Sequence, residues 1–489
     1  MSTQAVILTG MAVYIVIMIA IGLYSAKRTH TVVDFTVAGR SLPMWLCTAT
    51  IVATWFGGGV MIGVAGSAYE NGMLGVIADP FGAAMALFLV GMFFVRLIRR
   101  LGLFSFIEFV EQRFGFSAGV IAALASMTSS LMWVAGMLVA FGIVFETLTG
   151  VSLTVGIIGG AIIVVTYTSL GGMLAVALTD FVQMIIIAVG LVILLVVVLV
   201  DAGGWSAIAS QLPEGTFRMV PREHTLDQWL VYLRAWFIFG LADIASQSLM
   251  QRALSARNER VAQNSFYAAT ISYIGFGMIP VLLGIIASVT MPGLNNPESV
   301  VPTMALEHLH PVAIAIFVGA VLAAIMSSCD SAILAAATVF STNILPLVKR
   351  APSDQLRLIV IRLGIPVGGL LALAGALNSE EVFNTALDAN MLMLAAVIAP
   401  FILGMWWRKA NRAGALGGMW AGIAAWLVVS FALPELPADL VGFGVCLATM
   451  LVVVPLTQSI DPPRGLVDHH GNAVELTDRL GVLKQKRAA

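Results

Sequence analysis

The sequence predicts an all-α protein that crosses a membrane many times. Hydrophobic residues make up 60% of the 489 residues, charged residues make up only 10%, and the mean hydropathy is +0.99. This composition offers too few polar side chains to cover a soluble domain, and its apolar stretches are long enough to cross a bilayer as helices. The 47 glycines agree with this class, because small residues let helices pack closely in lipid.

About thirteen apolar stretches of roughly 20 residues, separated by short polar segments, are the predicted spans. They lie near 5–24, 43–69, 75–96, 117–146, 151–169, 175–200, 226–250, 261–290, 311–345, 357–377, 381–407, 413–433 and 438–458. The first stretch lacks a basic flank and a small-residue cleavage site, so we expect it to be retained as a span. We therefore expect a transmembrane domain over residues 1–458, and a polar, basic tail over 459–489.

The basic residues predict the orientation of the chain. Of the 25 Lys and Arg residues, 22 fall in alternate loops, starting with residues 25–42, and in the tail. Because basic loops stay in the cytoplasm, this asymmetry predicts an external N-terminus and a cytoplasmic C-terminus in the cell membrane. The opposite loops hold only Arg218 and Arg222, and Arg234 lies within a span.

Other signals exclude several classes of protein. Cys47, Cys329 and Cys446 all fall in apolar segments, which predicts neither a disulfide framework nor a metal cluster. No nucleophile with a nearby base and no phosphate-binding loop occurs in the sequence, so we do not expect an enzyme. The expected partners are a small-molecule solute and the lipid bilayer, with no nucleic acid. The sequence gives no indication of an oligomeric state.

The most informative motif is Trp55-Phe56-Gly57-Gly58-Gly59, inside the second predicted span. Consecutive glycines weaken a helix, and exposed backbone at mid-membrane depth is tolerated only where protein or a water-filled cavity covers it. Interrupted helices are the usual means by which transporters offer carbonyl oxygens to an ion, and the adjacent indole offers a π-face to a cation. The motif therefore predicts an ion-coupled carrier.

A second interruption suggests an internal repeat. The seventh span loses its apolar character over residues 240–248, which contain Asp243 and three serine or glutamine positions. Since the two interrupted spans lie five spans apart, the second group of five enters the membrane from the opposite side. We therefore expect an inverted repeat, with one copy over about 43–200 and the other over about 226–407.

Four motifs begin at residues 38, 167, 251 and 323: AGRSLPMWL with ATWFGGGVMIGVAGSAYENG, YTSLGGMLAVALTDFVQ, QRALSA, and AAIMSSCDSAILAAATVFSTNI. Together they resemble the sodium:solute symporter family over roughly residues 1–460, and ATWFGGG and MSSCDS are most similar to its choline-transporter branch. The resemblance implies a LeuT-type fold of inverted five-helix repeats with alternating access. It also implies Na⁺ as the coupling ion.

The resemblance places a sodium site between the second and ninth spans. Its ligands would be the backbone carbonyls of Ala53, Phe56 and Ala324 and the hydroxyls of Ser327 and Ser328. The residues agree, because positions 324, 327 and 328 share one helical face and Na⁺ prefers oxygen ligands. The alternative is that both serines only bond to backbone within a crowded helix.

The family also suggests a second cation site, formed here by Asp180, Asp330 and Ser331. Asp330 departs from the all-hydroxyl pattern of the members that bind an additional sodium ion. The alternative is that Asp180 and Asp330 pair with inward-facing arginines to form a gate, and the sequence leaves both hypotheses open.

The substrate pocket is predicted from buried acidic and aromatic residues. Carboxylates within spans are costly and usually functional, and acidic groups with indole faces suit an amine or a quaternary ammonium compound such as choline. The candidate residues are Trp55, Trp133, Asp79, Asp243, Ser246 and Asp388. Four of them have a stated structural alternative: packing or interfacial anchoring for the two tryptophans, helix capping for Asp79, and bridging to backbone amides for Asp388.

The match to a choline pocket is incomplete. In the choline branch a third tryptophan completes an aromatic cage, but the corresponding position here is near Ser246. Asp243 would compensate by charge, which favours a protonated amine. The alternatives are a zwitterion such as proline or betaine, or a small carboxylate, carried by the same fold. A membrane solute sensor is a more remote alternative, because the tail is short for a signalling domain.

Overall fold

The computed structural model describes residues 3–27, 31–169, 172–223, 225–379 and 381–481. Its first half consists of α1 (Thr3–Ala26), α2 (Val32–Val37), α3 (Met44–Trp55), α4 (Ala65–Asn71), α5 (Ala83–Leu89), α6 (Val95–Leu101), α7 (Phe106–Phe114), α8 (Phe116–Thr149), α9 (Leu153–Thr168), α10 (Gly172–Asp201) and α11 (Trp205–Ala209). The prediction of an all-α membrane protein is confirmed.

The second half continues the helical bundle and ends in a small hairpin. Its helices are α12 (Leu226–Gly240), α13 (Gln247–Ser255), α14 (Glu259–Thr290), α15 (Val300–His308), α16 (Pro311–Val339), α17 (Leu345–Val348), α18 (Asp354–Ala376), α19 (Val382–Asp388), α20 (Ile398–Trp406), α21 (Arg412–Ala432) and α22 (Ala438–Thr457). Strand β1 (Leu466–Val467) pairs antiparallel with β2 (Ala473–Val474).

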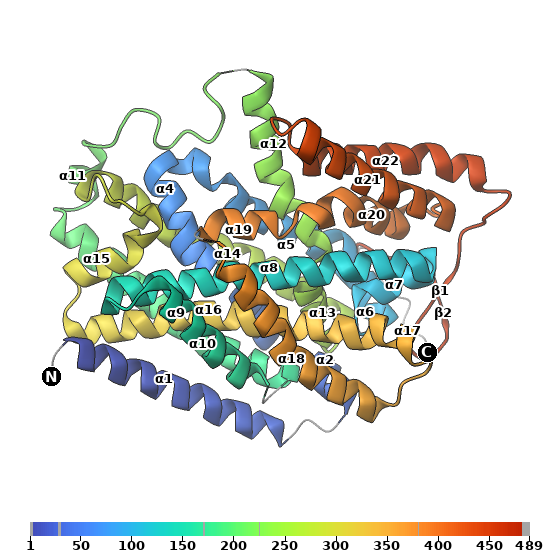
Figure 1. The fold of residues 1–489 in the computed structure, drawn as a ribbon, viewed down its shortest axis with the longest axis horizontal. Coiled ribbons are helices and arrows are strands. Elements are labelled where there is room, and N and C mark those ends of the chain that lie inside the picture. Colours follow the sequence, from blue (N-terminus) through green and yellow to red (C-terminus); the bar gives the residue numbers. More distant parts are fainter. Residues whose placement is uncertain (1–2, 28–30, 170–171, 224, 380, 482–489) are drawn as a thin grey trace.

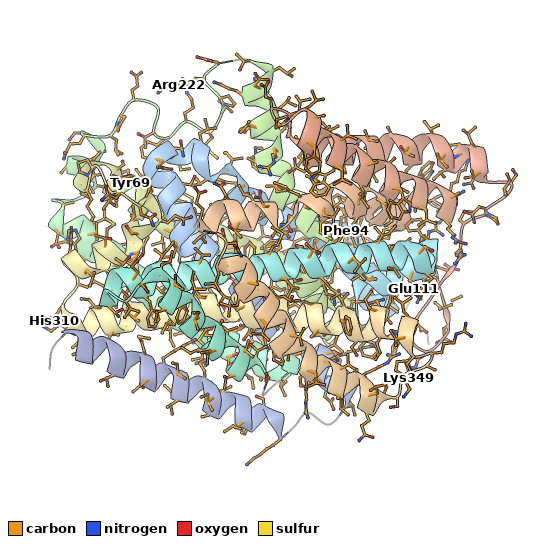
Figure 2. All side chains as sticks on the ribbon, in the orientation of Figure 1. Tyr69, Phe94, Glu111, Arg222, His310 and Lys349 are labelled. Atoms are coloured by element: carbon orange, nitrogen blue, oxygen red, sulfur yellow. The ribbon has the colours of Figure 1, made fainter. Side chains whose placement is uncertain are left out.

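The long helices run roughly along the long axis of the molecule, with α8 and α16 through its middle (Figure 1). Helix α1 packs against α10 and α16 at one edge, and the pair α21 and α22 lies at the other. Figure 2 shows His310 and Lys349, which flank the ninth predicted span, at opposite ends of this axis. The long axis is therefore the direction in which the helices would cross a bilayer.

Among the described residues, nine helices are long and apolar enough to cross a membrane, or ten if one bent pair is counted as a single span. Shorter apolar helices occupy the predicted spans 5–24, 43–69 and 151–169. The expected number of about thirteen therefore stays a prediction.

Both predicted interruptions are present. Helix α3 ends at Trp55, and the chain resumes a helical course in η2 (Gly59–Val64), a wider π-helix. Helix α12 ends at Gly240 and is followed by a 3₁₀ turn, η6 (Ala242–Ala245), before α13, with a bend of 46° between the two parts. These breaks lie inside the bundle, where neighbouring helices cover the backbone.

The tail lies against the end of the bundle that carries α6 and α7 (Figure 1). The backbone N–H of Val467 donates to Gln112 of α7 at 3.1 Å, and that of His469 donates to the carbonyl of Leu101 at 3.1 Å. Helix α7 begins at a capping box, in which Ser105 and Glu108 each bond the other's backbone N–H. The described part of the predicted tail, residues 459–481, thus lies against the membrane domain.

Candidate ion and solute site

Two of the three glycines of the broken span, Gly57 and Gly58, lie where two other helices approach it closely. A Cβ added at Gly57 would be 2.3 Å from Ser328 Oγ, and one added at Gly58 would be 2.5 Å from the Cβ of Ala140. Since none of the three glycines has a positive φ, Gly57 and Gly58 are required for close packing of α8 and α16 and not for an unusual backbone conformation. The break itself is at Phe56, whose ψ of 67° ends α3.

The predicted sodium ligands of α16 face this break. Ser327 Oγ donates to the carbonyl of Ala53 at 2.9 Å and to that of Ala324 at 2.9 Å. Ser328 Oγ is fully buried beside Gly57 and has no hydrogen-bond partner among the described residues. A buried hydroxyl without a partner is costly, and a hard cation would satisfy it. The oxygens of these residues therefore fit an alkali cation.

The residues of the proposed second cation site surround a buried arginine. Arg252 of α13 and Asp180 of α10 are both fully buried, with 3.7 Å between Nη2 and Oδ2. Arg252 also donates to the carbonyl of Ser248 at 3.0 Å, to the hydroxyl of Thr50 at 3.3 Å and to that of Ser331. A buried charge needs such partners, because an isolated one would cost several kcal/mol.

Asp330 and Ser331 join this cluster from α16. Ser331 Oγ lies 3.1 Å from Asp330 Oδ1 and donates to the carbonyl of Ser327 at 2.6 Å, which links the cluster to the predicted sodium ligands one turn away. Asp180 Oδ1 is buried and accepts no hydrogen bond from the described residues. The guanidinium of Arg252 therefore favours the gate hypothesis, whereas the free Asp180 oxygen favours a cation site.

Trp55 and Asp79 meet at a tyrosine that the sequence analysis missed. Tyr273 of α14 donates its hydroxyl to Asp79 Oδ1 at 2.9 Å, and this hydroxyl lies 3.5 Å from the carbonyl of Trp55. The rings of Trp55 and Tyr273 meet edge to face at 6.2 Å, and Trp55 is 5% exposed. Asp79 is therefore held beside the break by Tyr273, and does not cap a helix through its side chain.

Asp243 occupies the second break. Asn390 donates to Asp243 Oδ1 at 3.0 Å, and Ser129 of α8 donates to Asn390 Oδ1 at 2.9 Å. These residues and Ser246 line a cavity of about 10 Å³, close to the space that one water molecule requires. Ser246 Oγ bonds to Ser248 Oγ at 3.0 Å, so the position of the missing tryptophan is a polar corner of this cavity.

Trp133 of α8 faces the first break from the opposite side. Its Cη2 would lie 3.7 Å from a Cβ on Gly59, and its ring meets that of Phe239 edge to face at 6.1 Å. The structure thus brings Trp55, Trp133, Asp79 and Asp243 to the two helix breaks.

Asp388 lies apart from them, and its assignment to the substrate pocket stays a prediction. Its side chain is 48% exposed and lies 3.8 Å from Arg234, whose Nε donates to the buried Asp439 at 2.7 Å. The reason is local, because α19 ends at Asp388 and the chain turns before Asn390, which is the residue that reaches Asp243.

A cavity of about 920 Å³, which would be the outer cavity in the predicted orientation, lies beside the second span. It is bordered by Gly63 and Gly66 of the second span and by Ala78, next to Asp79. Four glutamates line it, together with one arginine: Glu70, Glu146, Glu298, Glu381 and Arg234. An acidic entrance of this kind raises the local concentration of cations.

Tyr273, Thr50, Ser129 and Asn390 are the contacts that sequence reasoning missed. Tyr273 and Asn390 are polar residues within apolar spans, which is a weak signal on its own. Their partners come from other helices, so only the fold reveals the pairing.

Two interrupted helices with facing carbonyl and hydroxyl oxygens define an ion-coupled secondary transporter. The chain belongs to the sodium:solute symporter family, whose family model matches residues 35–422. Its coupling ion is therefore Na⁺. The predicted resemblance is confirmed.

Named relatives agree with this assignment. The chain is 27% identical to the high-affinity choline transporter 1 of Drosophila melanogaster over 83% of this chain and 68% of that protein, and 28% identical to its human counterpart over 85% and 75%. It is 26% identical to the sodium/proline symporter of Staphylococcus aureus over 84% and 83%. The solved structure of a Na⁺-coupled sialic acid symporter superimposes with a TM-score of 0.81 at 20% identity, covering 95% of this chain and 99% of that one. The LeuT-type fold is confirmed.

Proposed function

We propose that this symporter imports a small cationic solute, an amine or a quaternary ammonium compound such as choline. Two observations support this: the named choline-transporter relatives, and the buried carboxylates of Asp79 and Asp243 at helix breaks that Trp55 and Trp133 face. The second observation carries the proposal, because a carboxylate inside a membrane protein is costly to bury and a cationic solute would supply the opposite charge that favours its ionised form.

Sodium would bind at the carbonyls of Ala53, Phe56 and Ala324 and the hydroxyls of Ser327 and Ser328. The ion would replace the hydrogen bond between Ser327 and Ala53 and satisfy the Ser328 hydroxyl. Because these ligands belong to α3 and α16, bound sodium would hold the two helices together. The adjacent break would then be fixed in the geometry that presents Trp55 and Asp79 to the solute.

Arg252 and Asp180 would close the path on the inner side. They lie one helical turn beyond the sodium ligands and fill the space there with a buried ion pair. Separation of this pair would open the route by which sodium leaves, and Asp180 would receive the ion on its free oxygen. The Arg252–Asp180 pair would therefore act as the gate while it is closed, and Asp180 would act as part of the second cation site after the pair separates.

The orientation follows from the basic loops, with the N-terminus outside and the tail in the cytoplasm of a cell membrane. Each charge that moves down a potential of 100 mV yields about 2.3 kcal/mol, before its concentration gradient is added. A cationic solute would add its own charge to this driving force, so the coupling energy is adequate for uptake against a gradient.

A zwitterion such as proline or betaine is the alternative cargo, and the sodium/proline relative favours it. A zwitterion also needs a donor for its carboxylate. Arg234 is the basic residue that lines the described outer cavity, and it already bonds to Asp439. This arrangement favours the cation over the zwitterion.

The test is a thermal shift of the purified protein against choline, primary amines, betaine, proline and small carboxylates, in sodium and again in potassium. We expect a sodium-dependent rise in the melting temperature with one of the cations. A rise with proline or a carboxylate, and none with any cation, would contradict the proposed cargo but not the family.

A further inference from the structure

A cavity on the inner face is lined by arginines from three segments. It measures about 530 Å³ and lies between the tail hairpin and the ends of α7 and α20, the region at the right of Figure 1. Its charged lining residues are Arg113, Arg408, Arg464 and Glu475. This volume is within the range of small-ligand pockets.

Arg113 forms the buried wall of this cavity. It is 4% exposed, and its guanidinium donates to the carbonyl of Arg408 at 2.8 Å, to that of Trp407 at 3.3 Å and to that of Arg464. Its Nε has no partner among the described residues. Arg113 is therefore held in place by neutral carbonyls, which orient the charge without neutralising it.

The three lining arginines and the neighbouring Arg479 form an arginine cluster. Among the described residues, this cluster has no acidic partner in ion-pair contact. Within the described chain, no carboxylate lies within 4.0 Å of the guanidinium of Arg113, Arg408, Arg464 or Arg479. Burial lowers the pKa of Arg113, and the charge of Arg479 lowers it further. Burial also lowers the pKa of Arg479, together with the charge of Arg408. These like charges are thus close enough to repel one another.

Other arginines near the tail, in contrast, are paired with acidic residues. On the same face, Arg96 lies 3.3 Å from both Glu259 and Asp478, and Arg100 lies 3.0 Å from Glu259. A general excess of basic residues on the cytoplasmic side does not explain this difference, because Arg96 and Arg100 are paired with acidic residues whereas the arginines of the cavity are not. The arginine cluster therefore has an unmet need for negative charge.

The cavity lies close to the level of the lipid headgroups. Arg479 stacks over the ring of Trp406 at 4.7 Å, and this tryptophan is 36% exposed at the end of α20. Tryptophans at span ends mark the membrane interface. Gly115, at the end of α7, has no side chain, and this lets the guanidinium of Arg464 approach closely. A Cβ added at Gly115 would lie 3.0 Å from that guanidinium.

We propose that this arginine cavity binds a phosphate group, carried by an anionic phospholipid of the inner leaflet or by a free phosphate ester. Guanidinium groups bind phosphate oxygens in pairs of charge-assisted hydrogen bonds. A phosphate bound here would bridge the tail, through Arg464, to the ends of α7 and α20, through Arg113 and Arg408. The ligand would thereby fasten the tail to the membrane domain.

The experiment measures the thermal stability of the full-length protein, purified in a neutral detergent. The probes are a short-chain phosphatidylglycerol, the matching phosphatidylcholine and inorganic phosphate. The variant Arg408→Gln/Arg464→Gln removes two exposed side chains and keeps the backbone carbonyls that hold Arg113. The matched control Lys349→Gln/Arg350→Gln removes two exposed charges from another inner loop.

We expect a saturable rise in melting temperature with phosphatidylglycerol and none with phosphatidylcholine. The cavity variant should weaken the apparent affinity at least about tenfold, given the strength of charged hydrogen bonds, and the control should not. The same pattern with inorganic phosphate would support the site and identify a soluble anion as its ligand. Equal losses in both variants, or no anion-dependent rise in the parent protein, would overturn the proposal.

Discussion

The hydroxyl of Ser328 lies directly against the backbone of Gly57, so that no side chain fits between α16 and the broken span. A Cβ at Gly57 would be 2.3 Å from Ser328 Oγ and 2.8 Å from the sulfur of Met137. The same hydroxyl has no hydrogen-bond partner among the described residues. The contact between these two residues therefore sets the spacing of the oxygens that we propose as sodium ligands.

The first prediction concerns this spacing. Gly57→Ala should displace Ser328 and raise the half-saturating sodium concentration about tenfold or more, because overpacking typically costs about 1–3 kcal/mol. Gly59→Ala is the matched control, since its nearest neighbour would be 3.5 Å away, an ordinary contact. Sodium titrations of uptake compare the two. Similar titration curves for both variants would show that the Gly57 contact does not control sodium binding.

The second prediction separates the two serines. Ser328→Ala should leave the melting temperature in potassium unchanged, because the lost hydroxyl bonds to nothing described, but should abolish the stabilisation by sodium. Ser327→Ala should also abolish sodium-stimulated uptake, and should lose about 1 kcal/mol in potassium as well, because Ser327 bonds to Ala53. Thermal melts in both salts provide the measurement. A Ser328→Ala protein that keeps its full sodium response would exclude this hydroxyl as a ligand.

The third prediction concerns Trp55. If its indole binds a cation, Trp55→Ala should weaken binding of the solute far more than Trp55→Phe, because phenylalanine retains a π-face. Cation–π contacts contribute about 0.5–2 kcal/mol, so the difference should be two- to thirtyfold in affinity. Competition binding of an amine in sodium measures it. Equal losses in the two variants would indicate that Trp55 only packs against Tyr273.

The fourth prediction tests the gate. Arg252→Gln should destabilise the protein by about 3–5 kcal/mol, because it leaves the buried carboxylate of Asp180 without its charge partner. Arg252→Gln with Asp180→Asn should recover most of this loss, since no lone charge remains. Unfolding measurements on the three proteins form the test. If the double variant is no more stable than the single one, the two side chains do not act as a pair.

Most of the membrane layout could be predicted because it depends on local properties. Hydropathy and glycine content located the segments, and the breaks at residues 56–58 and 241–246 followed from runs of small or polar residues. The proposed sodium ligands, Ser327, Ser328 and the facing carbonyl of Ala53 among them, came from the family resemblance. The spacing of the two serines agrees with it, because residues three and four positions from Ala324 share a helical face.

The other side-chain contacts of the candidate site could not be predicted, because they depend on pairings between distant segments. Tyr273 and Asp79 are 194 residues apart in sequence, and Asn390 and Asp243 are 147 apart. No periodicity within one helix predicts which residue of another helix will face it. Asp388 and Asn390 show the limit of such reasoning. They are two positions apart, yet Asp388 is half-exposed beside Arg234, whereas Asn390 bonds to the buried Asp243.

The last prediction compares the buried Asp243 with the half-exposed Asp388. Asp243→Asn should keep its bond from Asn390, because the amide oxygen still accepts, but should remove the charge that we propose for solute binding. Solute affinity should therefore fall at least about tenfold, the loss expected when a charged hydrogen bond is removed. Asp388→Asn should leave affinity unchanged and alter only the transport rate, because Asp388 is half-exposed and contacts Arg234, which lines the entrance cavity, at 3.8 Å. Equilibrium binding of the solute in sodium, together with initial uptake rates, distinguishes the two effects. If Asp388→Asn weakens binding as much as Asp243→Asn does, the charge of the entrance, and not that of the second helix break, selects the solute.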